Sequence, residues 1–496
     1  MPRGLLRLAG CALLSLGTVT VAEDTWPYMT LQTAPYQPPQ IQITKSGTTD
    51  PGYLFVGPRG NQPAGTAALI YDEDGNLVYQ GPDQVTANFQ VQRLFNQDVL
   101  TFWGGNMTDL GFGYGVVHIL DNTYREIYTV TLQGDFETPD HSVPDSYIDL
   151  HESHISARNT LLVTAYNVTQ QSLTDIGGTP DDYMLDSLFY EIDIATNEIV
   201  HSWSALEHVD QIALTDSKQG IDDDHGTHEQ PWDAYHINSV ELFDEGYIIS
   251  LRHYWSGYYV HGNGSVMWQF SGELGRGDFQ LDQGGAFSWQ HDIRIYNQTE
   301  HGMILTLFNN ANTPTETVAE STGLSYAVDL VNRTATTLRT LSDADDVIHS
   351  VSQGNYQLLP SGHVVLGYGS IAKIKEFDAD GKEVLTAQFG TDNEVASYRG
   401  YKCSWKATPF WPPAVVVRRV GDDSAQVFMS WNGATEYDNW AVMAASPDGV
   451  DTTIITTFKR TGFETSGTVR GVQTPYLQVV ARRGDIPLGM SPVVSF

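Results

Sequence analysis

The feature of this sequence that most limits the possible folds is a recurring unit of short, strand-like runs between residues 51 and 405. In each unit an alternating apolar run ends in aspartate, a tight turn follows, and a second run begins. The runs that end in this way are Ile70–Asp72, Ile119–Asp121, Tyr190–Asp193, Val328–Asp329 and Glu376–Asp378. Repeats of about 40 to 60 residues with four short antiparallel strands each are typical of β-propellers. We therefore predict an all-β protein in which residues 51–405 form a β-propeller of about six blades.

The overall composition agrees with this prediction. The chain has 46 glycines, 11% aromatic residues and only 17% charged residues, which fits short strands joined by tight turns. Two stacked β-sandwiches are the alternative, although they would not require the repetition. The Asp72–Gly75 turn resembles part of a calcium loop, but the full ligand spacing is missing, so we interpret it as a hairpin turn.

The two ends of the chain differ from the repeating region. Residues 1–22 combine Arg3 and Arg7 with the apolar run Leu8–Leu16 and a small-residue cleavage site, which predicts a secretory signal peptide. Residues 23–50 are polar and rich in proline, and we expect an extended N-terminal segment. Beyond Phe410–Pro413, the short alternating runs of residues 411–496 predict a C-terminal β-sandwich-like module.

The charge and the sequons indicate where the protein works. A net charge of −34 excludes a nucleic-acid-binding class, and an anionic substrate would need a local cationic site. No stretch after the signal peptide is long enough to span a bilayer, so we expect the secretory pathway and an extracellular protein. Five sequon asparagines are predicted to be glycosylated at the surface, namely Asn106, Asn167, Asn263, Asn297 and Asn332. Cys403 stands alone once Cys11 leaves with the signal peptide, which predicts a buried thiol and no intramolecular disulfide.

The candidate site lies between residues 229 and 296, where histidine, tryptophan, asparagine and aspartate are concentrated. His236 and His291 each stand in a polar cluster beside a strand-like run, as expected for side chains that a β scaffold presents to one pocket. A hydrogen-bonded structural histidine is the alternative for either position. The nearby Asp222–His228 resembles a metal-binding cluster, but its spacing matches no standard site, so we interpret it as a solvated loop and predict no metal and no cofactor.

Several motifs, taken in order, resemble the fungal branch of the arylsulfotransferase family over most of residues 51–443. They are Asp149–Glu152, Glu207–Val209, Asp233–Ser239, Ser288–Asp292, Ser352–Asn355 with Gln357–Pro360, Ser397–Arg399 with Lys402, and Ser430–Thr435. The resemblance implies a six-bladed propeller that moves a sulfuryl group between phenols through a histidine, without a nucleotide donor.

The resemblance also implies roles for residues of this chain. His236 with Asn238, and His291 with Asp292, match two site histidines of the family and their neighbours, and either histidine is a candidate nucleophile. Arg252 and Arg294 are the nearest cations for a substrate anion, with a surface ion pair as the alternative for each. The residues expected to bind the substrate are His151, Asn238, Asp292, Tyr235 and Trp289. Two departures concern the expected arginine, absent from Phe308–Asn312, and a late histidine, for which His349 and His363 are the candidates.

Two other functions remain open from the sequence. An aromatic pocket could guide a cyclisation or cycloaddition of a natural-product intermediate. The aromatic residues available for it are Trp232, Tyr235, Tyr254, Trp255, Trp268 and Trp289. A non-catalytic secreted binding protein is the third interpretation. The expected partner is thus a small aromatic or natural-product molecule, and no pattern indicates an oligomeric state.

Overall fold

The computed structural model describes residues 26–35, 37–60, 66–221 and 225–496. The predicted signal peptide, residues 1–22, lies outside the described residues. The described chain is all-β. Its helices are four short 3-10 segments, η1 (Thr174–Ile176), η2 (Leu206–His208), η3 (Leu214–Asp216) and η4 (Arg252–Tyr254). It contains no helix with the length and hydropathy needed to cross a lipid bilayer.

Apart from the short β3–β27 pair, the described strands between residues 42 and 403 form six sheets, here called sheets I to VI, which are antiparallel except for the parallel pairing of β18 with β22 in sheet IV. Sheet I contains β6 (Thr86–Leu94), β7 (Gln97–Met107), β8 (Gly113–Leu120) and β9 (Glu126–Val130). Sheet II contains β10 (Ser153–Ile155), β11 (Thr160–Gln170), β12 (Tyr183–Asp193) and β13 (Ile199–Ser204). Sheet III contains β14 (Ile237–Phe243), β15 (Gly246–Leu251), β16 (Ser256–His261) and β17 (Val266–Ser271).

The remaining three sheets include the strands from the two ends of this region. Sheet IV contains β18 (Gln280–Leu281), β19 (His291–Tyr296), β20 (Gly302–Asn309), β21 (Thr322–Asp329) and β22 (Thr334–Leu341). Sheet V contains β23 (Asn355–Leu358), β24 (Val364–Gly367), β25 (Lys373–Phe377) and β26 (Glu383–Gln388), with β1 (Gln42–Lys45) at its edge. Sheet VI contains β2 (Tyr53–Val56), β4 (Leu69–Tyr71), β5 (Leu77–Gln80) and β28 (Gly400–Cys403). A short pair joins β3 (Arg59–Gly60) to β27 (Val395–Ala396).

The aspartates that recur in the sequence terminate strands for a specific reason. The Oδ1 atom of Asp72 accepts hydrogen bonds from the backbone N–H groups of Asp74 (3.0 Å) and Asn76 (2.8 Å), and so closes the hairpin turn. The other four aspartates of the repeat accept equivalent backbone bonds, namely Asp121, Asp193, Asp329 and Asp378. The sequence repeat therefore corresponds to one kind of turn, closed by an aspartate side chain, that occurs in five of the six sheets.

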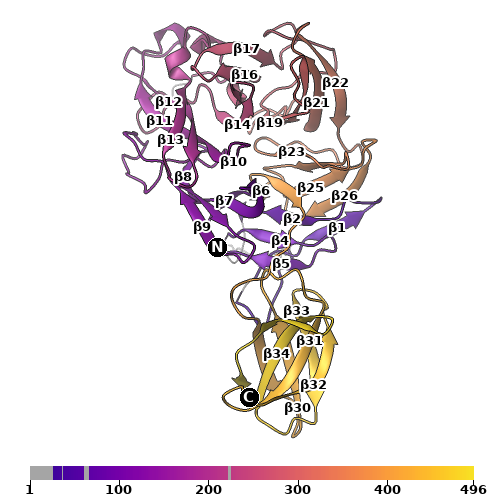
Figure 1. Cartoon of the computed structure of the whole chain (residues 1–496). Coiled ribbons are helices and arrows are strands. Elements are labelled where there is room, and N and C mark those ends of the chain that lie inside the picture. The colour runs from indigo at the N-terminus through magenta and orange to yellow at the C-terminus, as the bar shows by residue number, and fades with distance from the viewer. Residues whose placement is uncertain (1–25, 36, 61–65, 222–224) are drawn as a thin grey trace, which may run out of the picture.

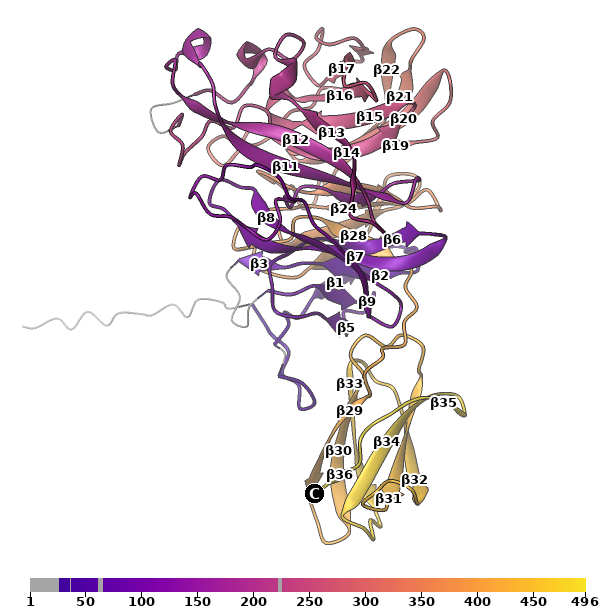
Figure 2. The ribbon, with the colours of Figure 1, turned by 60° about the vertical axis from the view of Figure 1, so that its left-hand side comes forward.

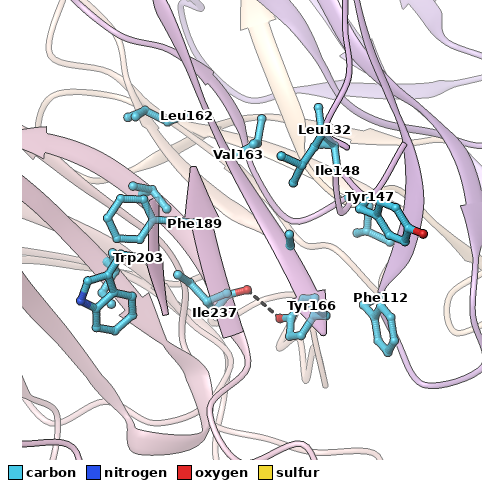
Figure 3. Close-up of a cluster of buried hydrophobic side chains, with 14 of the residues drawn as sticks. Phe112, Leu132, Tyr147, Ile148, Leu162, Val163, Tyr166, Phe189, Trp203 and Ile237 are labelled. Carbon is cyan, nitrogen blue, oxygen red and sulfur yellow. Dashed lines mark hydrogen bonds between the residues drawn. The ribbon is translucent and has the colours of Figure 1, made fainter. Parts of the chain in front are cut away.

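The sheets follow one another around a common centre (Figure 1). Strands of successive sheets are in contact, in the pairs β6 and β10, β11 and β14, β14 and β19, β19 and β23, β24 and β28, and β28 and β6. Sheet VI joins the two ends of the region, because Tyr53 to Val56 of β2 pair with Cys403 to Gly400 of β28. Hydrophobic side chains fill the space between neighbouring sheets; Figure 3 shows Phe189, Trp203 and Ile237 in one such cluster.

The C-terminal strands form two further sheets below this ring (Figures 1 and 2). One contains β29 (Ala414–Arg419), β30 (Ser424–Ser430) and β33 (Glu464–Arg470). The other contains β31 (Asn439–Ala445), β32 (Thr452–Lys459), β34 (Tyr476–Arg483) and β35 (Ile486–Met490), with β36 (Val494–Ser495) paired to β34. Both sheets contribute to one hydrophobic cluster that includes Val427, Trp440 and Val479.

The sequon asparagines do not all have the same exposure. Asn106, Asn263, Asn297 and Asn332 are exposed, whereas Asn167 is half-buried and its Oδ1 accepts a hydrogen bond from the backbone N–H of Glu137 (2.8 Å). Cys403 has no disulfide partner among the described residues, and burial raises the pKa of its thiol to about 11.

Candidate functional site

Three histidines occupy the same place in three successive sheets. His151 precedes β10 by two residues, His236 directly precedes β14, and His291 is the first residue of β19. Because these sheets are in contact, the three imidazoles come close together. The ring centroids of His151 and His236 are 4.8 Å apart, and those of His236 and His291 are 6.4 Å apart. His253, from η4, stacks on His236 at 4.7 Å.

His236 is oriented by a carboxylate. Its Nδ1 lies 2.5 Å from Oδ2 of Asp233. Because a carboxylate only accepts hydrogen bonds, Nδ1 carries the proton and Nε2 has the free lone pair. His236 has a φ of 56°, in the left-handed region that non-glycine residues rarely adopt, and its carbonyl accepts a hydrogen bond from Arg252 N–H (3.0 Å). Burial, with His151 and Arg252 nearby, holds the pKa of His236 well below 6.5, so the imidazole is neutral at physiological pH.

A cavity of about 340 Å³ opens beside this dyad. Asp233, His236, Arg252 and His253 line one part of it, and its other lining residues include Asp109 and Leu110. No described residue forms a hydrogen bond with Nε2 of His236. The atom that has the lone pair therefore belongs to a residue that lines open space.

Arg252 places a positive charge at this cavity. Its Nη1 donates to His253 Nε2 (2.9 Å), its Nη2 donates to the Val351 carbonyl (3.0 Å), and the guanidinium lies 5.0 Å from the ring centre of Trp289. The Nε atom is buried without a hydrogen-bond partner. No carboxylate oxygen of the described residues lies within ion-pair distance of this side chain, although the Asp233 carboxylate is near enough to favour its charged form. Burial lowers the pKa of Arg252 to about 10, which leaves it charged at neutral pH. A buried cation of this kind is suited to an anionic ligand.

His253 and His291 use both of their ring nitrogens within the protein. His253 Nδ1 donates to the Asp233 carbonyl (2.7 Å), and its Nε2 accepts from Arg252. His291 Nδ1 donates to Asn310 Oδ1 (2.7 Å), and its Nε2 accepts from the backbone N–H of Gln353 (3.1 Å). Burial lowers the pKa of His253 to about 3 and that of His291 well below 6.5. Both rings are therefore neutral, and neither has a free lone pair.

His151 has a carboxylate partner of its own. Its Nδ1 lies 2.6 Å from Oδ2 of Asp149, a carboxylate that also accepts from Thr164 Oγ1 (2.9 Å) and from the backbone N–H of Gly113 (2.9 Å). Burial opposes ionisation of Asp149, but the His151 ring and these donors keep its pKa below the ordinary value. The chain thus presents two His–Asp pairs side by side.

Arg294 has a different setting from the one expected of a cation that holds substrate. Its guanidinium contacts three carboxylates, those of Glu152 (2.7 Å), Asp292 (2.8 Å) and Glu241 (3.4 Å). Arg399 completes this buried network, at 3.1 Å from Glu152 and 3.5 Å from Asp292. The network links residues of sheets II, III and IV with the start of β28, so Arg294 and Asp292 position the strand starts that carry the histidines.

The other predicted substrate-binding residues lie at different depths. Asn238 is buried and donates from Nδ2 to the Gln290 carbonyl (2.8 Å), which ties β14 to the segment before His291. Tyr235 is buried and stacks on Tyr254 at 5.4 Å, away from the cavity lining. Trp289 is the aromatic surface under Arg252.

Sequence reasoning did not assign roles to Asp149, Asp233, His253, Asn310 or Arg399. The two aspartates had a signal, because each precedes its histidine by two or three residues within a motif. His253 had none, since it lies in an apolar run and reaches the site only through the turn at η4.

The ligand atoms of Asp233, His236 and His253 lie within 4.8 Å of one another, a spacing that could hold a metal ion. The adjacent Arg252 guanidinium, which donates to His253 Nε2, opposes a second cation there.

A larger cavity of about 840 Å³ lies at the junction with the C-terminal strands. It is lined by residues such as Tyr79 and Trp411, and none of the four clustered histidines is in its lining.

Comparisons with known proteins give one family. The family described as "Arylsulfotransferase (ASST)" matches residues 90–390, more than half of the 496-residue chain. No curated protein matches.

Among solved structures, a protein of unknown function from Bacteroides caccae shares 10% identity, with a TM-score of 0.39 over 71% of this chain and 99% of that chain. A catalytically inactive virginiamycin B lyase from Staphylococcus aureus shares 8% identity, with a TM-score of 0.30 over 78% and 96%. A streptogramin B lyase shares 8% identity, with a TM-score of 0.32 over 73% and 98%.

Proposed function

Because this chain belongs to the arylsulfotransferase (ASST) family, we propose that it transfers a sulfuryl group from an aryl sulfate to a phenolic acceptor, with His236 as the nucleophile. The observation that carries the proposal is the arrangement of Asp233, His236 and Arg252. A neutral imidazole with a free Nε2 lines a cavity, its tautomer is fixed by a carboxylate, and a cation without a carboxylate partner lies beside it. These are the requirements for nucleophilic attack on an anionic ester.

In the first step, Arg252 binds the sulfate oxygens and Nε2 of His236 attacks sulfur in line. The N–S bond forms while the bond from sulfur to the aryl oxygen breaks, and the electron pair leaves with the phenolate. We assign the transfer of a proton to the leaving oxygen to His151, whose buried ring lies 4.8 Å from that of His236.

In the second step, the oxygen of the acceptor phenol attacks sulfur. The N–S bond breaks, its electron pair returns to Nε2, and the phenol proton passes to His151. Asp149 stabilises the charge on His151 at this stage, as Asp233 stabilises that on sulfated His236.

The lining of the cavity favours this reaction over a guided cyclisation. Asp109, Asp233, His236 and Arg252 give the cavity a polar and charged wall, whereas a cyclisation would need a mainly apolar one. Of the aromatic residues considered for such a pocket, Trp232 lines the cavity, whereas Tyr235, Tyr254 and Trp268 are buried in hydrophobic clusters and do not.

We also infer the finer architecture and location that suit this function. The contact of β28 with β6 supports a closed six-bladed propeller, and the shared cluster of β29–β36 supports a β-sandwich-like module. Three features support a secreted glycoprotein: the net charge of −34, the signal-peptide pattern in the sequence of residues 1–22, and the four exposed sequon asparagines. Intact mass before and after enzymatic deglycosylation, with N-terminal sequencing of the secreted protein, tests the location.

The experiment on function uses a chromogenic aryl sulfate with and without a phenol acceptor. We expect phenol release that depends on the acceptor in the wild type, none in His236→Gln, and an unchanged rate in His301→Gln, where an exposed histidine outside the cluster is replaced. Donor alone followed by an alkaline quench should add one sulfuryl group to the mass of the peptide that contains His236. Absence of acceptor-dependent release from a folded wild-type protein, over a panel of aryl sulfates, would reject the proposal.

A further inference from the structure

A second histidine cluster lies outside the candidate site, at the edge of sheet II. Glu137, His141 and His228 offer ligand atoms that all lie within 4.8 Å of one another. The rings of His141 and His228 stack at 4.1 Å, and Nε2 of His228 is 3.9 Å from Oε2 of Glu137.

The side chains of this cluster form no hydrogen bond within the described part of the chain, although the His228 ring packs against the edge of Tyr183, with ring centroids 5.1 Å apart. His228 makes no hydrogen bond to a described residue: its Nδ1 is buried without a partner, and 3.9 Å is too long for a bond from Nε2 to Glu137. The side chain of His141 likewise has no described hydrogen bond. This contrasts with His253 and His291, whose ring nitrogens are all bonded.

We propose that Glu137, His141 and His228 bind one divalent transition-metal ion of the zinc class. Two imidazoles and one carboxylate form a donor set that zinc accepts with water in the fourth position, whereas calcium and magnesium prefer oxygen ligands. Tetrahedral zinc places its ligand atoms about 3.4 Å apart and lies in the plane of each imidazole that binds it, so the cluster must contract by up to about 1.4 Å. The exposed His141 ring must also rotate out of its near-parallel stack on His228, where the interplanar angle is 16°. The Glu137 side chain is 68% exposed and is free to make this movement.

The ion would connect two segments that are anchored to neighbouring strands. Glu137 is fixed to β11, because its N–H donates to Asn167 Oδ1 (2.8 Å) and its carbonyl accepts from Val168 N–H (3.0 Å). The segment with His228 is fixed to β12, where Tyr183 N–H donates to the Gly226 carbonyl (2.8 Å).

The same segment leads from His228 to the candidate site. Asp233 and His236 follow His228 after five and eight residues. The cavity of about 570 Å³ beside the cluster shares Asp109, Leu110 and Gln230 with the cavity at His236. A bound ion therefore holds in place the wall of the cleft that carries the His236–Asp233 pair. This inference does not depend on sulfuryl transfer, since metal binding is measured without substrate.

The test is calorimetric titration of chelator-treated, full-length protein with zinc chloride near neutral pH. We expect one zinc site in the wild type that is weakened by about tenfold or more in Glu137→Gln and in His141→Ala, and lost in His141→Ala combined with His228→Ala. His301→Ala removes an exposed histidine outside the cluster and should leave the affinity unchanged. Because Glu137 is exposed, Glu137→Gln tests the site even if the double variant fails to fold.

Cobalt(II) provides a second measurement, since its visible absorption reports tetrahedral coordination. Equal zinc affinity in the wild type and in Glu137→Gln and His141→Ala would overturn the proposal, as would a wild type that binds no zinc. Loss of zinc binding in His301→Ala would place the site elsewhere and would overturn it as well.

Discussion

The Nδ1 atom of His236 lies 2.5 Å from the Oδ2 atom of Asp233, the residue three positions earlier in the chain. The left-handed backbone of His236 turns the side chain back toward this carboxylate directly before β14 begins. Asp233 in turn holds His253, because its carbonyl accepts from Nδ1 of that ring. One aspartate thus fixes the tautomer of one imidazole and the position of the imidazole stacked upon it.

This relationship predicts a large effect of Asp233→Asn on turnover. An asparagine that presents its N–H₂ group to Nδ1 would move the ring proton to Nε2 and remove the lone pair that attacks sulfur. We expect kcat with an aryl sulfate to fall by about 10³ to 10⁴, as in other His–Asp pairs, with little change in KM. Steady-state kinetics measure this, and thermal unfolding of the variant serves as the control for folding. A loss below about tenfold would show that Asp233 does not set the tautomer.

The two candidate nucleophiles respond differently to replacement by glutamine. His291 only donates to Asn310 and accepts from Gln353 N–H, and a glutamine side chain can do both. We therefore expect His291→Gln to keep measurable transfer, while His236→Gln has none. Single-turnover release of phenol distinguishes the two. The reverse result would assign the nucleophile to His291.

Part of this structure follows from local sequence signals. The recurrent aspartates indicate repeated hairpins because each closes a turn within its own unit, as Asp72 does. The positions of His236 and His291 follow from motifs directly before a strand. Both signals are short-range, and for that reason they can be read from one chain.

The partners of the charged groups could not be predicted in this way. Arg294 was expected to bind a substrate anion. In the structure it is paired with Glu152, which lies 142 residues earlier, and it belongs to the buried network. Arg252 has the same residue type and a similar local sequence setting, yet it has no carboxylate partner among the described residues. The difference arises from which strand starts lie close together, and therefore from the packing of sheets that are far apart in the sequence.

This difference predicts opposite behaviour for two arginine variants. Arg399→Met leaves the fully buried Glu152 with one cation fewer, and we expect the free energy of unfolding to fall by about 3 to 5 kcal/mol. Arg252→Met leaves no ion-paired carboxylate, so the loss of stability should be smaller, while KM for an aryl sulfate rises by about tenfold or more.

Denaturant unfolding and steady-state kinetics measure the two effects. Arg333→Met is the matched control, because the Arg333 guanidinium also lies over an aromatic ring, that of Phe279 (5.1 Å), but outside the site. A rise in KM for Arg333→Met, or an unchanged KM for Arg252→Met, would contradict the role given to Arg252.

The buried histidines predict how stability depends on pH. Burial lowers the pKa of His253 from 6.5 to about 3, so between these values the unfolded chain binds a proton that the folded protein does not. The contribution of neutral His253 to stability is therefore fully present above pH 6.5 and is lost as the pH falls toward 3, by up to about 1.4 kcal/mol per pH unit.

His253→Gln tests this, because the glutamine keeps a donor for the Asp233 carbonyl and an acceptor for Arg252 but cannot titrate. The free energy of unfolding is measured with denaturant between about pH 5 and 6.5, where surface carboxylates are ionised. Its increase per pH unit should be smaller for the variant than for the wild type. An equal pH dependence of stability in the two proteins would mean that His253 is protonated in the folded protein. The assignment of His253 as a neutral ring that accepts from Arg252 would then be wrong.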